Sequence, residues 1–451
     1  MNLCNIANIP IFYYDLISLT STMEWWTCVV LLCVTAVLAD DEWLEVEIEQ
    51  GVVRGRRHPS GHLYAFYNIP YATGPEGVDK FKAPLPPPTW SEPFDATDDK
   101  NIVCPQGKYL LDIMPGNVEM KEDCLIANVF VPDTTEKNLS VLVYVHGGGF
   151  VLGYGNFYQG TELMKTKDFI MVTFNYRLGI HGFLCLGTED VPGNAGMKDQ
   201  VALLRWVQKN IASFGGNLDD VTIAGYSAGS ASVDLLMLSK AAEGLFHRVI
   251  PESGGNLAAF TVQRDPLKIA KTHAKELNDL AIVDDLDALE QFYKTTTMEL
   301  LTANMFLDRP DSTFLFSPCV ERDIDGAFLT ESPLSILKKG DFKKLPMLYG
   351  FTNMEGLLRI EYFDIEPVPE GSTTLPAWPA AGANWSPHMV LNETLELSGV
   401  LLEDRTLFWE GIYEKYYQDP VPPNATAQKN IFNLFTLFFL FFFTKISLQQ
   451  N

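Results

Sequence analysis

The chain has 451 residues, of which 47% are hydrophobic and 20% charged, a balance typical of globular proteins. Its formal net charge is −24 at pH 7 and its pI is about 4.6. A surface this acidic repels phosphate backbones and anionic lipid headgroups, which argues against nucleic-acid and membrane partners and favours an acidic protein of extracellular fluid. No repeat or linker divides the middle of the chain, so residues 40–429 are interpreted as one domain.

The amino terminus contains two candidate starts. Residues 23–39 read MEWWTCVVLLCVTAVLA, an apolar run that ends in a small residue and is typical of a secretory signal peptide. Residues 1–22 are interpreted as an extension upstream of the true start. A membrane anchor is the alternative, and it is disfavoured because the run is too short to span a bilayer. The sequence therefore predicts a secreted, extracellular protein.

Secretion changes how the cysteines are interpreted. Beyond the leader the chain retains Cys104, Cys124, Cys185 and Cys319. The close pair Cys104 and Cys124 is suited to a disulfide in an oxidising compartment. The apolar surroundings of Cys185 and Cys319 predict buried thiols. Nothing has metal-ligand spacing, so no metal site is expected.

N-glycosylation sequons also fit a secreted glycoprotein. They lie at Asn138, Asn392 and Asn424. A fourth sequon, at Asn384, is followed directly by Pro387 and is set aside.

Short apolar runs alternate with longer helical patterns along the domain. The expected buried strands are residues 141–145, 169–175, 221–225, 248–253 and 345–350. Within residues 199–214, apolar side chains recur at the spacing of one helix face: Val201, Leu204, Val207 and Ile211. This alternation predicts an α/β fold whose mostly parallel central sheet is covered by helices on both faces. The polar and apolar residues of 43–55 alternate, which predicts an antiparallel hairpin at the sheet edge.

A candidate nucleophile follows the third of these strands. In VTIAGYSAGS (221–230), Ser227 stands between Gly225 and Gly229, and a helical run comes next. A strand, a G-x-S-x-G turn and a helix form the nucleophile elbow, which presents the serine hydroxyl above the positive end of the helix. The motif alone also fits an ordinary glycine-rich turn; the flanking strand and helix favour the nucleophile.

A second glycine-rich segment supplies candidate donors for an oxyanion. YVHGGGF (144–150) follows a predicted strand, and its glycines let the backbone approach a ligand closely. The amides of Gly148, Gly149 and Ala228 are the expected three donors, and losing one such donor costs about 2.7–4 kcal/mol of transition-state stabilisation. His146 is interpreted as a residue that shapes this loop. The alternative is a plain flexible loop.

Several motifs together resemble one known family. They are KEDCLIANVFVP (121–132), YVHGGGF, TFNYRLGIHGFL, GNAGMKDQVALLRWVQKNIASFGGN and GYSAGS. In this order, from residue 43 to residue 429, they resemble the type-B carboxylesterase and cholinesterase family of α/β-hydrolases, and within it the antennal carboxylesterases of moths.

The resemblance implies a fold, a chemistry and a site. It implies an α/β-hydrolase that cleaves carboxylic esters through an acyl-serine intermediate, without a cofactor. It also implies a Cys104–Cys124 disulfide, and it places the acid of the catalytic triad at Glu355 in YGFTNMEGLL (349–358).

The general base of such a triad is missing from the expected place. The chain order in this fold is serine, acid, histidine, and the family motif is a histidine followed by glycine, about a hundred residues or more after the acid. The one histidine after Glu355 is His388, in NWSPHMVL, which does not match. Residues 430–451 form a Phe-rich tail unlike the family, interpreted as a reading frame that leaves the true coding sequence near Lys429. The fold is therefore expected to be incomplete at its carboxyl end, and the chain as written nearly inactive.

Two departures from the cholinesterases argue against a choline ester as substrate. The loop between Cys104 and Cys124 contains no tryptophan for cation–π binding, and Tyr226 stands where cholinesterases have glutamate. Small neutral, apolar esters of the odorant, pheromone or xenobiotic type are expected, and juvenile hormone esters remain an alternative. The rival class is a noncatalytic ester-binding or adhesion-like protein of the same fold, and the retained Ser227 disfavours it.

Overall fold

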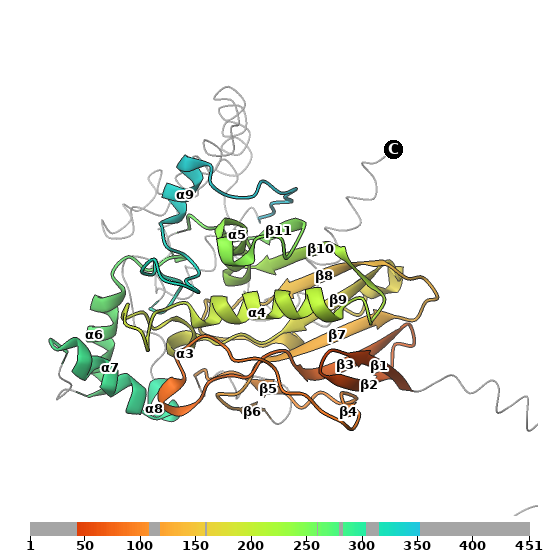
Figure 1. Cartoon of the computed structure of the whole chain (residues 1–451), viewed down its shortest axis with the longest axis horizontal. Helices are drawn as coiled ribbons and strands as arrows, with labels where there is room; N and C mark the ends of the chain where they lie inside the picture. Colours follow the sequence, from red (N-terminus) through yellow and green to blue (C-terminus); the bar gives the residue numbers. More distant parts are fainter. Residues whose placement is uncertain are drawn as a thin grey trace, which may run out of the picture.

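A nine-stranded sheet organises the residues that the structure describes, namely 43–107, 118–157, 160–258, 260–278, 283–303 and 315–351 of this computed structural model. Its main path runs β1-β2-β3-β7-β9-β8-β10-β11, and β4 pairs with β2 (Figure 1). The antiparallel side comprises β1 (Trp43–Ile48), β2 (Gly51–Arg57), β3 (Leu63–Pro70) and β7 (Ile126–Pro132), with β4 (Phe94–Asp95) alongside. The parallel side comprises β9 (Phe169–Phe174), β8 (Leu139–Val145), β10 (Gly216–Tyr226) and β11 (Arg248–Glu252). A separate small sheet pairs β5 (Ile102–Val103) with β6 (Glu119–Met120).

The α/β architecture predicted from the sequence is confirmed, with a central sheet that is mixed rather than mostly parallel. The hairpin expected over residues 43–55 is confirmed, since β1 and β2 pair antiparallel from Trp43 opposite Arg56 to Ile48 opposite Gly51. The β2–β3, β3–β7 and β7–β9 pairs are antiparallel as well. The pairs among β9, β8, β10 and β11 follow the predicted parallel pattern, and the short β4 also pairs in parallel with β2. Between the parallel strands β8 and β10 the chain forms a crossover that includes β9 and helix α4, as parallel pairing requires.

Residues 345–350, predicted to form a strand, lie beside β11 and pair with it through two isolated parallel bridges. Met347 pairs in parallel with Val249, and Gly350 pairs in parallel with Glu252. Leu348 N donates to Val249 O at 3.0 Å, and Gly350 N donates to Pro251 O at 3.0 Å.

Side chains alternate between two apolar clusters on the two faces of the sheet. In β8, Val141, Val143 and Val145 belong to the larger cluster, whereas Leu142 and Tyr144 belong to the smaller one. Strand residues alternate in this way because successive side chains point to opposite faces. The described helices contribute to the larger cluster, and Met164 of the short 3-10 turn η4 (Leu163–Thr166) contributes to the smaller. Helices on the second face therefore stay a prediction.

Helix α4 (Ala195–Asn210) lies in front of the sheet (Figure 1), and its buried apolar side chains belong to the larger cluster. It begins four residues before the predicted helix, after Asn194 in the left-handed conformation, and the predicted face is buried as expected. The other helices are α3 (Gly179–Phe183), α5 (Ala228–Leu238), α6 (Pro266–Leu277), α7 (Leu286–Thr295), α8 (Met298–Leu301) and α9 (Pro333–Lys339). The remaining 3-10 turns are η2 (Gly77–Asp79), η3 (Gly155–Phe157) and η5 (Lys240–Ala242).

One ion pair is fully buried beneath the amino-terminal end of α4. The Arg177 and Asp199 side chains are 1% and 0% exposed, and Arg177 Nη2 lies 2.6 Å from Asp199 Oδ1. Arg177 Nη1 also donates to the carbonyl oxygens of Lys80 and Lys82 at 3.0 and 2.7 Å. The buried charges are thus both paired and hydrogen-bonded, which is the condition for keeping them out of water.

The structure contains two disulfides among its described residues. Cys104 and Cys124 are joined as expected. Cys185 and Cys319, expected to be buried thiols, are joined as well, so that prediction is wrong although both residues are buried. Their sequence separation is 134, and the fold alone brings them together.

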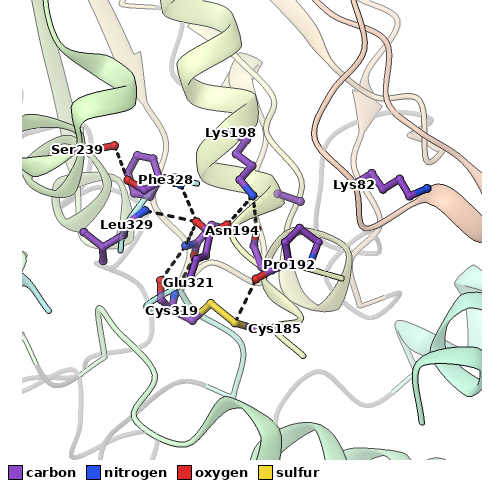
Figure 2. Close-up of polar contacts among 12 residues, drawn as sticks. Lys82, Cys185, Pro192, Asn194, Lys198, Ser239, Cys319, Glu321, Phe328 and Leu329 are labelled. Carbon is purple, nitrogen blue, oxygen red and sulfur yellow. Dashed lines mark hydrogen bonds and ion pairs between the residues drawn. A yellow bond between two sulfur atoms is a disulfide. The ribbon is translucent and has the colours of Figure 1, made fainter. Parts of the chain in front are cut away.

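The contacts that bring Cys319 to Cys185 centre on Asn194 and Glu321 (Figure 2). Asn194 Nδ2 donates to Cys319 O at 2.8 Å and to Glu321 Oε2 at 2.7 Å, and Cys319 N donates to Asn194 Oδ1 at 2.8 Å. Lys198 of α4 pairs with Glu321 Oε1 at 2.5 Å, and Phe328 N donates to Glu321 Oε2 at 2.7 Å. These bonds attach the segment around residues 319–329 to the start of α4.

Across the described ranges, no helix combines the length and apolarity needed to cross a membrane. The same ranges contain no cluster of three or more His, Cys, Asp or Glu side chains arranged to hold a metal ion.

Replacing Asp199 by Asn should destabilise the fold by about 3–5 kcal/mol, because it leaves the Arg177 guanidinium buried without its counter-charge. Urea unfolding at pH 7 measures the change. Asp341→Asn is the control: it breaks a pair with Lys240 whose side chains are 61% and 66% exposed, and it should leave the urea midpoint nearly unchanged because water screens this pair. Equal losses in the two variants would contradict the assigned role of the buried pair.

Candidate active site

Ser227 occupies a sharp turn between β10 and α5. Its φ of 57° and ψ of −119° lie in a region that residues with a side chain rarely adopt. Ser227 N donates to Glu252 O of the neighbouring strand β11 at 2.8 Å, and Ala231 N of α5 donates to Ser227 O at 3.0 Å, so β11 and α5 both hold the turn. This geometry matches the nucleophile elbow expected from the sequence. The side chain of Ser227 is half-buried.

Glycines permit the close backbone contacts around this turn. A Cβ on Gly229 would lie 2.1 Å from Val145 O, and a Cβ on Gly225 would lie 2.5 Å from the Gly229 backbone. A Cβ on Gly147 would lie 2.5 Å from Tyr226 O and 3.3 Å from Ser227 Cβ. The glycine-rich segment after β8 and the serine turn after β10 are therefore in direct contact, as parallel neighbouring strands require.

Neighbouring side chains shape the glycine-rich segment. His146 is buried, its Nδ1 lies 2.8 Å from Gly147 O, and its ring stacks on Tyr176 with centroids 4.4 Å apart. Tyr176 Oη donates to His146 O at 2.9 Å. Burial lowers the pKa of His146 to about 4, so its imidazole is neutral at pH 7. These contacts agree with a loop-shaping role for His146. They leave Gly148 and Gly149, at φ values of 110° and 63°, as half-buried backbone beside the serine turn.

The segment that leads to Glu355 reaches the same edge of the sheet. Ser253 N, directly after β11, donates to Gly350 O at 2.8 Å. The chain therefore leaves the sheet beside β11, the neighbour of the strand that carries Ser227. Glu355 itself lies outside the described residues, as do His388, Asn392 and Asn424.

No described histidine is hydrogen-bonded to Ser227. Apart from His146, the ring contacts include His247 Nδ1 with Val221 N at 3.2 Å and His273 Nδ1 with Tyr293 Oη at 3.2 Å. Among the described residues, Ser227 and the half-buried glycine backbone after β8 therefore lie together, and no described histidine ring is bonded to that serine.

Two carboxyl groups beside the elbow, of buried Asp234 and half-buried Glu252, were not anticipated from the sequence. Burial raises the pKa of Asp234, on α5, to about 6, although Asn256 N donates to its Oδ2 at 2.7 Å. Burial also raises the pKa of Glu252, at the end of β11, to about 7. The residue after Glu252 has a φ of 56°, but no local motif marks the glutamate as buried.

Comparisons with known proteins match this chain to esterases. The family model described as the carboxylesterase family matches residues 42–440. The chain is 38% identical over 323 residues to juvenile hormone esterase of Heliothis virescens, covering 68% of this chain and 57% of that one. It is 38% identical over 318 residues to para-nitrobenzyl esterase of Bacillus subtilis (strain 168), covering 69% of this chain and 63% of that relative.

The fold has solved counterparts as well. A structure of PNB esterase superimposes with a TM-score of 0.61 at 35% identity, covering 70% of this chain and 64% of that one. The chain spans 57% and 63% of the length of the two curated relatives named above.

Glu252 predicts an unusual dependence of stability on pH. The folded protein holds the Glu252 proton up to about pH 7, whereas the ordinary pKa is 4.5, so the protonated form stabilises the fold at low pH. This stabilisation is lost as the pH rises from 4.5 through 7. Glu252→Gln should match the wild type at pH 4 and exceed it at pH 8 by a few kcal/mol, at about 1.4 kcal/mol per unit of pKa shift. Urea unfolding at both pH values measures the difference.

Glu331→Gln is the control, because the pKa of Glu331 is lowered in the folded protein whereas that of Glu252 is raised. A hydrogen bond from Lys339 lowers the pKa of the Glu331 carboxyl, so this ionised group favours the fold at neutral pH. The variant should gain nothing at pH 8. A Glu252→Gln curve parallel to that of the wild type would contradict the burial of this carboxyl.

Proposed function

The chain belongs to the carboxylesterase family, and we propose that its site is built to hydrolyse carboxylic esters through an acyl-serine intermediate on Ser227. The observation that carries the proposal is the left-handed backbone of Ser227 at the junction of β10 and α5, with Gly147 against its Cβ. Such a turn exposes a nucleophile beside backbone donors, and a purely structural turn has no need of that strain.

The proposed reaction assigns one role to each group. Ser227 Oγ attacks the ester carbonyl carbon, and the carbonyl oxygen becomes an oxyanion that accepts hydrogen bonds from the amides of Gly148, Gly149 and Ala228. The tetrahedral intermediate collapses, the C–O bond to the alcohol breaks, and an acyl-serine forms. Water then attacks this ester and releases the acid, which regenerates Ser227.

Both half-reactions require a general base. The base removes the proton from Ser227 and delivers it to the leaving alkoxide, and Glu355 would orient it. We propose that this chain lacks that base, since His388 does not match the family motif and no described histidine is hydrogen-bonded to Ser227. Removing the histidine of such a triad lowers turnover on the order of a million-fold.

The proposed substrates are small, neutral, apolar esters of the odorant, pheromone or xenobiotic type. Para-nitrobenzyl esterase, one of the relatives, is named for an ester with an uncharged alcohol. The loop closed by Cys104 and Cys124 offers no tryptophan to a quaternary ammonium group. Juvenile hormone esters remain the second candidate because another relative is named for them.

The proposed site of action is outside the cell, on a glycosylated chain with a leader over residues 23–39. The proposal is supported by two disulfides, which form and persist in oxidising compartments. It is also supported by the exposure of Asn138, which lies in the left-handed conformation directly before β8.

Covalent labelling separates the serine hydrolase from a noncatalytic binding protein. A fluorophosphonate probe should modify Ser227 of the purified chain slowly, and Ser227→Ala should abolish the label. Hydrolysis of para-nitrophenyl butyrate should remain near the level of Ser227→Ala, because the base is missing.

Two outcomes would contradict parts of this proposal. Turnover of about 10 s⁻¹, the median for enzymes, would show that the chain contains a base after all, and His388→Ala would then test the remaining candidate. A Ser227 that never reacts, in a folded chain that binds the ester, would favour the binding protein.

Glycosylation at Asn138 is expected when the chain is expressed through a secretory pathway. Asn138→Gln should increase gel mobility by one glycan, and treatment with a glycosidase should remove this difference. An unchanged mobility in secreted material would contradict the use of this sequon.

A further inference from the structure

We propose that Gln106 is a positioning residue for the oxyanion donors Gly148 and Gly149, through a clamp on the backbone of Gly153. This inference rests on the proposed function, which assigns those two amides to the oxyanion. Gln106 lies outside the glycine-rich segment and the elbow, two residues after the first cysteine of the Cys104–Cys124 disulfide.

The orientation of the Gly149 N–H depends on the carbonyl of Gly148. Gly148 O accepts hydrogen bonds from Val151 N at 3.1 Å and Leu152 N at 3.0 Å. The Gly148 C=O and the Gly149 N–H belong to one planar trans peptide and therefore point in opposite directions. Fixing the carbonyl toward residues 151–152 thus aims the N–H away from them.

The loop that provides these two bonds ends at Gly153, which packs against its beginning. Gly153 has a φ of 118°, and a Cβ there would lie 2.4 Å from His146 Nδ1 and 2.8 Å from Gly147 O. The loop is thus closed by backbone contact, and a displaced Gly153 would shift the residues on both sides of it. Leu152, which bonds Gly148 O, is the direct neighbour of Gly153.

The side-chain amide of Gln106 holds both polar groups of the Gly153 backbone. Gly153 N donates to Gln106 Oε1 at 3.1 Å, and Gln106 Nε2 donates to Gly153 O at 3.1 Å. The second Nε2 hydrogen is directed to Cys104 O, also at 3.1 Å. The side chain is fully buried, so water does not replace these bonds.

Gln106 is itself attached to a rigid base. The disulfide joins Cys104 to Cys124, and both cysteines are buried. A second side-chain amide, of Asn175, links the disulfide to the chain two residues after Gly153. Asn175 Nδ2 donates to Ile102 O and Cys124 O at 2.8 and 3.2 Å, and Gly155 N donates to Asn175 Oδ1 at 2.8 Å. The disulfide loop is therefore coupled to the oxyanion segment through Gln106, with Asn175 beside it.

Gln106→Met tests the clamp, because methionine has a similar length without the amide. Hydrogen exchange of amides 149–153, read by mass spectrometry, should accelerate at least tenfold. The rate constant for fluorophosphonate labelling of Ser227 should fall at least tenfold. Gln106→Leu also lacks the amide, so it should accelerate exchange and slow labelling in the same way, and it serves as the second variant if the methionine chain does not fold.

Gln208→Met is the matched control. Gln208 Nε2 also donates to two carbonyl oxygens, of Leu218 at 3.1 Å and Leu245 at 3.0 Å, but at the opposite end of β10 from Ser227. This variant should lower the urea midpoint without changing exchange at residues 149–153 or the labelling rate. If the Gln106 variants alter neither quantity beyond the Gln208 control, the positioning role is wrong.

The labelling and hydrogen-exchange measurements test the hydrolase function and the positioning role separately. If Ser227 is unreactive even in the unmodified chain, the proposed hydrolase function fails, while the exchange comparison still decides whether Gln106 holds the segment. If labelling proceeds and exchange accelerates without any loss of labelling rate, the hydrolase function stands and the positioning role is overturned.

Discussion

Direct backbone contact between two turns is the constraint on which the rest of the site depends. The turn after β8 and the turn after β10 touch where Gly147 meets Tyr226 and Ser227, and where Gly229 meets Val145 O. Such contact requires neighbouring parallel strands that end at the same level, and β8 and β10 pair in register up to Val145 opposite Gly225. The strand pairing therefore sets the distance between the proposed nucleophile and its proposed backbone donors.

The parts of the fold that follow from local patterns could be predicted from the sequence. The parallel strands, the edge hairpin and the buried face of α4 each depend on the spacing of apolar residues within one segment. The antiparallel pairing of β3, β7 and β9 could not be predicted in this way, because it depends on which strands become neighbours. The Cys185–Cys319 disulfide was missed for the same reason, since apolar surroundings suit a buried thiol and a buried disulfide equally well.

In the candidate site, too, residues within a local motif could be predicted from the sequence, and residues placed by distant contacts could not. Ser227, Gly148 and Gly149 stand in motifs whose spacing encodes their geometry. Gln106 and Glu252 stand in no such motif. The role of a glutamine after a cysteine, or of a glutamate at a strand end, depends on which distant residues pack against it. Gln106 is polar and buried because Gly153 presents both a donor and an acceptor there. The resemblance to a family supplied Glu355, which physical patterns alone would not have distinguished from other surface carboxylates.

The disulfide between Cys185 and Cys319 gives the molecule a closed covalent ring. The ring includes α4, β10, the Ser227 turn, α5 and β11, so both strands that bear on the nucleophile lie within it. A protease that cuts once between residues 186 and 318 would leave a single covalent molecule, with Ser227 still joined to both halves of the sheet. Fragments would separate only after reduction, so the Ser227 turn can survive a nick that would divide an unlinked chain.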